Sequence, residues 1–182
     1  MSEQLNLDGR PRVSILALDL SLTGTGFCLD GAVGVIRSKL SGYERLSEIR
    51  DAVARMCFGV DLVIIEDIVM AYTPGKKWDR TKLAGIIEMW LYDHRVTTVL
   101  LNPSTLKKYS TGKGNAQKIN MAQAAWRRFH LGEQHTDDNV IDAYLLWCAA
   151  REAYGGQVAK VPAAQAACIH RLEWPRVGSD AA

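Results

Sequence analysis

Short apolar stretches rich in branched side chains recur along the first half of the chain and predict the strands of one sheet. They cover residues 13–19, 25–30, 32–38, 62–66 and 96–101. Asp30-Gly31 separates the second stretch from the third and is typical of a hairpin turn. The first three strands are therefore expected to form an antiparallel meander.

Apolar positions three and four residues apart predict helices between and after the later strands. These helices cover residues 43–58, 80–94, 116–129 and 139–154, and Ser104 is placed to cap a further short helix. The order predicts an α/β protein with a five-stranded mixed sheet, made of the meander plus two parallel strands and flanked by helices. We expect an N-terminal extension, one domain and a partly flexible C-terminal tail, over residues 1–12, 13–154 and 155–182.

The composition indicates a globular protein with a core of its own. Hydrophobic residues make up 48% and charged residues 23% of the 182 positions, which excludes a disordered or membrane-embedded class. Residues 1–12 lack the apolar core of a signal peptide, and no run reaches the ~18 apolar residues of a membrane span. Cys28, Cys57 and Cys148 lie in apolar stretches without CxxC spacing and are predicted to be reduced core residues. We expect a soluble intracellular protein.

Positive charge is concentrated in one part of the chain. Residues 73–130 hold eleven cations against three acids, although the net charge of the whole chain is only +2. Such segregation favours a face that binds a polyanion. The alternative is a set of ordinary solvated helix faces.

Four acids lie where the expected fold could bring them together. Asp19 and Glu66 each end an apolar strand, and Asp138 and Asp142 lie one turn apart at the start of the last long helix. Acids at buried strand ends are costly unless a cation meets them, and carboxylate oxygens are ligands for divalent metals. The pattern predicts one divalent-metal site built from three distant segments. The alternatives are a polar strand end that caps a turn for Asp19 and a surface strand terminus for Glu66.

The same segments resemble the RuvC-type Holliday junction resolvases of the ribonuclease H-like superfamily, especially their phage forms. The matching stretches run from Leu18-Asp19 to Gly26, over Ile65-Glu66 and Met70-Ala71, from Leu106-Lys107 to Lys118, and from His135 to Ala143. The resemblance implies a ribonuclease H-like fold. It also implies a structure-specific endonuclease that acts on branched DNA, most simply a four-way junction, in the cytoplasm of a bacterial or phage-infected cell.

The resemblance further implies a two-metal site. Two Mg²⁺ ions roughly 4 Å apart, replaceable by Mn²⁺, would be held by four acids: Asp19, which would bridge both ions, Glu66, Asp138 and Asp142. The family usually spaces its last two ligands by three residues, and that position is Asn139 here, whereas Asp138 is four residues before Asp142. Both positions share the helical face of Asp142, and we place Asp138 ahead of Asn139. Asp137 is expected to cap the helix.

Lys107 and Lys118 match family lysines that handle the substrate, and a lysine there could stabilise the phosphate in the transition state. Further phosphate contacts are expected from Lys76, Lys77, Lys108 and Lys113. Tyr72 lies in the loop where the family carries an aromatic, junction-probing segment, so we expect it to stack on an unpaired base. Residues 82–90 correspond to the family's dimer contact, which implies a twofold homodimer. The alternatives are ordinary exposed cations and a helix that simply packs on the sheet.

Three other functions compete with a junction resolvase. A flap or replication-fork nuclease would use the same chemistry. A non-catalytic nucleic-acid-binding relative is suggested by Asn139. The glycines after Thr23 resemble the phosphate turn of actin-like ATPases, but such enzymes need a second similar lobe, and one lobe occupies most of this chain.

Overall fold

The computed structural model describes residues 13–68 and 77–177, with the side chains of the helix that begins at Lys77 described from Arg80 onward. Its centre is a five-stranded mixed sheet in the order β3-β2-β1-β4-β5, which confirms the predicted fold class. The strands are β1 (Ile15–Asp19), β2 (Thr25–Leu29), β3 (Ala32–Ile36), β4 (Leu62–Glu66) and β5 (Thr98–Leu101).

The first three strands form the expected antiparallel meander, and β4 and β5 extend the sheet in parallel beyond β1. Asp30 and Gly31 both have positive φ, of 49° and 95°, which is the backbone of a tight hairpin turn. Because β1 and β4 are parallel neighbours, their carboxyl ends lie at the same edge of the sheet.

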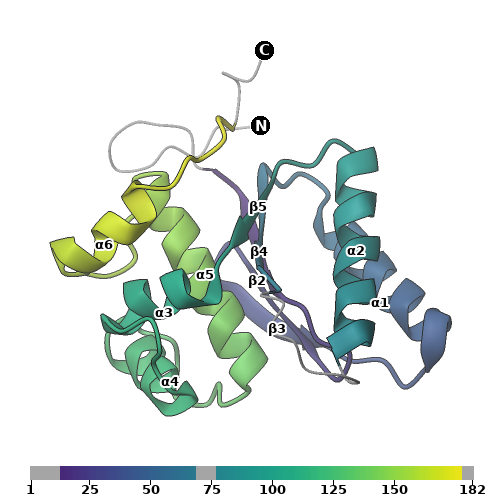
Figure 1. Ribbon diagram of the computed structural model, residues 1–182, viewed down its shortest axis with the longest axis horizontal. Helices are drawn as coiled ribbons and strands as arrows, with labels where there is room; N and C mark the ends of the chain where they lie inside the picture. The colour runs from purple at the N-terminus through teal and green to yellow at the C-terminus, as the bar shows by residue number, and fades with distance from the viewer. Residues whose placement is uncertain (1–12, 69–76, 178–182) are drawn as a thin grey trace.

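Strand alternation divides the interior into two cores. Leu16 and Leu18 of β1 face the helices α1 (Gly42–Met56) and α2 (Lys77–Asp93), whereas Ile15 and Ala17 face the opposite layer. That layer contains α3 (Pro103–Thr111), α4 (Lys118–Arg127), α5 (Asp138–Ala153) and α6 (Ala163–His170). Figure 1 shows α1 and α2 together on one side of the sheet and the other four helices on its other side.

Helix α5 is the central helix of its layer and packs on β1, β2 and β4. Its residues are buried on nearly every side from Val140 to Arg151, as expected for a helix that lies between a sheet and other helices. A Cβ atom at Gly26 would collide with the carbonyl oxygen of Asn139, so this glycine lets the start of α5 lie directly on β2. Gly26 pairs with Asp19 in the sheet, and the first turn of α5 therefore lies beside the end of β1.

Two helix starts test the predicted caps. The side-chain oxygen of Asp137 accepts the backbone N–H of Asn139, which confirms Asp137 as the cap of α5. At α3 the cap is Asn102, and the prediction of Ser104 was wrong. Asn102 Oδ1 accepts both the N–H and the hydroxyl of Ser104, and Pro103 occupies the first helical position, where its missing N–H costs nothing.

The segment after residue 154 contains a helix that the sequence did not predict. α6 packs on α3 and α5, and its Ile169 is fully buried. Trp174 packs against the same core and donates its indole N–H to the carbonyl of Ile169. A domain boundary at residue 154 stays a prediction.

Two composition-based expectations concern the cysteines and the membrane. Cys28, Cys57 and Cys148 are buried and free, as predicted. Among the helices of the described residues, none combines the length and hydropathy needed to cross a membrane.

Candidate active site

Asp19 and Glu66 meet at the carboxyl edge of the sheet. Leu18 pairs with Ile65 across the parallel strands, so the next residue on each strand brings the two acids side by side. Side chains two residues apart on a strand face the same side of the sheet. Asp19 is two residues after Ala17 and Glu66 two after Ile64, so both acids face the α5 layer. Both side chains are largely buried, with 7% of Asp19 and 13% of Glu66 exposed.

One arginine, from the opposite helix layer, binds both of these acids. Arg80 lies near the start of α2, and its Nη2 donates to Asp19 Oδ1 at 2.9 Å and to Glu66 Oε2 at 3.3 Å. The two acceptor oxygens are therefore separated by no more than the sum of those distances. Asp67, the next residue after Glu66, turns the other way, since burial and then the charge of Asp67 raise the pKa of Glu88 on α2.

The third segment is the start of α5. Asp138 lies in its first turn and accepts a hydrogen bond from Lys118 Nζ at 2.7 Å, and Lys118 is the first residue of α4. Asp142 lies one turn further along α5, on the face that meets the strand ends. Asn139 lies between them in sequence, but its side-chain amide lies beside Gly24, at the β2 side of the helix.

The pKa values show that these acids share one electrostatic environment. Burial, followed by the charge of Glu66, raises the pKa of Asp19 to about 8, even though Arg80 opposes the shift. Burial and the charges of Glu66 and Asp138 raise the pKa of Asp142 to about 7, with Lys118 and Lys107 opposing. The hydrogen bond with Asp138 raises the pKa of Lys118. Acids from β1, β4 and α5 therefore act on one another across a single site.

No protein-family model and no curated protein matches this sequence. Solved structures do match. Thermus thermophilus RuvC has a TM-score of 0.63 at 18% identity, over 82% of this chain and all of that one. The same protein in complex with its Holliday junction substrate has a TM-score of 0.66 at 17% identity, over 83% of this chain and all of that one. The fowlpox virus Holliday junction resolvase reaches a TM-score of 0.48 at 13% identity, over 78% of this chain.

The chain has the RuvC-like ribonuclease H fold. The resemblance suggested by the motifs is thus confirmed at the level of the fold.

Within this RuvC-like fold, the donor set fits a divalent cation. All the converging groups are carboxylates, which are hard oxygen ligands, and they carry more negative charge than the two ion-paired cations offset. Yet no three Asp, Glu, His or Cys side chains of the described residues stand close enough together to hold an ion as they are. Arg80 and Lys118 occupy oxygens that a metal would need.

The structure brings some of the predicted basic residues to the acids and leaves others apart. Lys107 and Lys118 act on Asp142, as described above. Lys108 lies on another side of α3, where its charge acts on Cys168 near the end of α6. Lys113 is exposed in the loop after α3. Tyr72 and Lys76 lie outside the described residues, and Lys77 begins α2 with a side chain that is not described.

Arg80 is the residue of this site that sequence reasoning missed. It was counted only among the cations of residues 73–130. Its position supplied one usable signal, since it lies near the start of the helix that follows the Glu66 strand. A long cation there can reach back over the end of the sheet.

Proposed function

We propose that this protein is a metal-dependent endonuclease that hydrolyses phosphodiester bonds in branched DNA, most simply at a four-way junction. The observation that carries the proposal is that Asp19, Glu66 and Asp142 lie at one edge of a RuvC-like sheet and act electrostatically on one another. The pKa values of Asp19 and Asp142 are raised by burial first and then by the neighbouring acids. Perturbed acids that converge in this way favour a functional site over a structural one.

Asp19, Glu66 and Asp142, with Asp138 or Asn139, would hold two Mg²⁺ ions. When bound, such a pair supplies an activated water and stabilises the leaving oxygen. The protein's own part is to fix these oxygens on the rigid ends of two strands and one helix. Lys107 and Lys118 lie close enough to act on Asp142, so they are placed to contact the phosphate that enters beside the acids.

The segment of residues 103–130 would hold the DNA backbone. It carries six cations and no acid, and it forms α3, α4 and the loop between them. An open groove of about 500 Å³ runs between the two helices, and Thr111, Asn120, Gln123, Arg127 and Arg128 line it. Arg128 is held in place by the carbonyl of Ser110 at 3.0 Å and by Gln165 at 2.7 Å. Such fixed donors and free positive charge suit phosphates.

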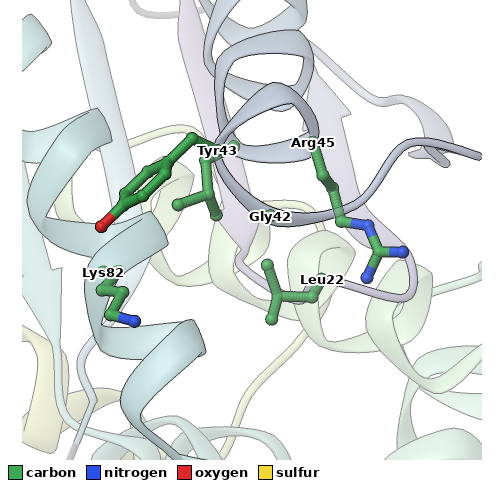
Figure 2. Close-up of a pocket in the computed structure, with 6 residues that line it drawn as sticks. Leu22, Gly42, Tyr43, Arg45 and Lys82 are labelled. Atoms are coloured by element: carbon green, nitrogen blue, oxygen red, sulfur yellow. The ribbon is translucent and has the colours of Figure 1, made fainter.

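The α1–α2 side would form a twofold dimer. Met89 is 59% and Tyr92 78% exposed, although both are large apolar side chains, and Ile86 and Trp90 line a groove between the helices. The adjoining hollow has a volume of about 140 Å³. Figure 2 shows its lining, in which the Tyr43 side chain of α1 points toward Lys82 of α2. Among the described residues no acid lines this hollow, so it suits a protein partner better than a metal. A nuclease that cuts two strands symmetrically needs two active sites, which a twofold dimer would supply.

Cleavage assays on synthetic DNA test the proposal directly. Four-way junctions, flaps, replication forks and linear duplex should be compared with Mg²⁺, with Mn²⁺ and with EDTA. We expect metal-dependent cutting of the junction and none of the linear duplex. Asp19→Asn should bind the junction and fail to cut it.

Two rival functions give different results in the same assay. Preferential cutting of flaps or forks would identify a fork nuclease with the same chemistry. Binding without cutting by the wild-type protein, with either metal, would identify a non-catalytic relative and would overturn the proposal.

A further inference from the structure

Arg80 makes a contact with both strand-end acids. A single nitrogen, Nη2, donates to Asp19 at 2.9 Å and to Glu66 at 3.3 Å. The two acids come from the centre of the sheet, whereas Arg80 comes from α2 in the opposite helix layer. The acids are largely buried and the arginine side chain is 38% exposed. Arg80 is therefore the partner that can leave.

The arginine and a metal ion need the same atoms. A divalent ion held at this edge would take its lone pairs from the carboxylates of Asp19 and Glu66. A guanidinium bound to one oxygen of each acid already uses part of that capacity. It would also repel a second cation placed between them.

We propose that Arg80 is a resident counter-ion, which pairs with Asp19 and Glu66 in the metal-free protein and leaves both acids when a divalent ion binds. The inference rests on the proposed function, because it takes these acids as metal ligands. Arg80 then has two opposite effects. It stabilises the metal-free fold by offsetting the repulsion between two buried acids, and it lowers metal affinity because its ion pairs must break first.

The contact is suited to reversal. Arg80 Nε is buried and has no hydrogen-bond acceptor among the described residues, and this unmet donor offsets part of what the two ion pairs contribute. A partly exposed arginine with one unmet donor can be displaced by a stronger cation. Removing it altogether would leave the two acids facing each other without the cation that bonds both of them.

Metal binding without DNA tests the proposal. Mn²⁺ alone is the probe, because unbound Mn²⁺ is counted directly by electron paramagnetic resonance. Full-length wild-type protein is compared with Arg80→Gln and Arg80→Lys at about pH 9, where protons compete least for Asp19. Arg50→Gln is the matched control, since it removes an arginine paired with Asp51 on α1, away from the acids.

Arg80→Gln should bind Mn²⁺ more tightly than the wild type, by roughly tenfold, which corresponds to 1.4 kcal/mol. Arg80→Lys should lie between them, because a lysine is a point charge that bridges two acids poorly. In EDTA the thermal midpoint of Arg80→Gln should fall below that of the wild type, and saturating Mn²⁺ should close the gap. Arg50→Gln should bind Mn²⁺ as the wild type does.

Equal or weaker Mn²⁺ binding by Arg80→Gln would overturn the proposal. If Arg80 only supports the structure of the site, its loss cannot strengthen metal binding. If that variant does not fold in EDTA, the wild-type protein still gives an answer. The Arg80 Nε–H resonance, assigned with Arg80→Lys, should shift when Mg²⁺ is added, and an unchanged resonance contradicts displacement.

The outcomes separate this proposal from the proposed function. If the wild type binds Mn²⁺ and cuts junctions while Arg80→Gln binds no tighter, only the role of Arg80 is wrong. If the wild-type protein binds no Mn²⁺ at all, the metal-dependent nuclease is wrong as well.

Discussion

Asp19→Asn should make the metal-free protein more stable at alkaline pH, although it removes the central acid of the site. Asp19 is buried, and its pKa is raised to about 8 by burial, then by Glu66, against the opposing effect of Arg80. The folded protein therefore binds a proton that the unfolded chain releases near pH 4. Above that pH, deprotonation favours unfolding, and stability falls as the pH rises toward about 8.

The size of the effect follows from the two pKa values. The interval between the ordinary 3.8 and about 8, at about 1.36 kcal/mol per pH unit, gives a ceiling of about 6 kcal/mol for the cost of ionising Asp19 in the folded protein. Asparagine keeps the shape and an acceptor for Arg80 but carries no charge. The attraction between the charged acid and Arg80 is already contained in this interval, because the pKa of about 8 includes it. We expect Asp19→Asn to gain at least about 2 kcal/mol above pH 8, which raises the melting temperature by roughly 4–8 °C.

Thermal unfolding in EDTA at about pH 5 and about pH 9 measures the effect, since the gain should be small at the lower pH and large at the higher one. Asp51→Asn, an exposed acid on α1, should show no such pH dependence. Saturating Mg²⁺ should stabilise the wild type and leave Asp19→Asn nearly unchanged. A variant less stable than the wild type at the higher pH, or a difference that does not change with pH, would refute the reasoning that Asp19 is a crowded, unneutralised acid.

Four further substitutions probe other parts of the molecule. Lys118→Met should weaken junction cleavage at least about tenfold while leaving the fold intact, because Lys118 is exposed and bonds only Asp138 among the described residues; unchanged cleavage would contradict a phosphate-handling role. Arg127→Ala should weaken junction binding for every sequence and reduce the slope of log K against log salt by about 1, measured by fluorescence anisotropy. Met89→Glu should convert the dimer to a monomer in analytical ultracentrifugation, whereas a monomeric wild type would contradict the dimer surface. Gly26→Ala should cost at least about 1–3 kcal/mol in urea unfolding, because its Cβ would collide with the backbone of Asn139, while Gly85→Ala has open space and should cost nothing.

The sheet and its acidic edge could be predicted because each depends on short-range pattern. Apolar runs gave the strands, Asp30-Gly31 gave the hairpin, and the parallel relation of the strands that end in Asp19 and Glu66 gave their meeting point. The helical period placed Asp138 and Asp142 one turn apart. The structure adds the position of that turn, which lies beside the end of β1. Gly26 is the local feature that decides it, since only glycine permits so close an approach of α5 to β2.

The rest depended on contacts that no local pattern encodes. Arg80 lies fourteen residues after Glu66, and its reach over the sheet edge is a matter of tertiary geometry. The α6 segment is rich in alanine and has no apolar period, because a single fully buried side chain, Ile169, anchors it to the core. At α3, Ser104 and Asn102 are both good caps, and the rigid backbone at Pro103 decides between them.

The charge distribution as a whole is what makes a metal ion necessary for the proposed chemistry. In the proposed function, DNA would approach through residues 103–130, an acid-free segment with six cations that would attract phosphates. The reacting phosphate would then meet four acids, of which Arg80 and Lys118 neutralise only part. A phosphate and a net-negative site repel each other unless cations stand between them. The proposed DNA path is lined by cations, but it leads to buried acids at the edge of the sheet. Phosphodiester hydrolysis there therefore requires that metal ions replace Arg80 at Asp19 and Glu66.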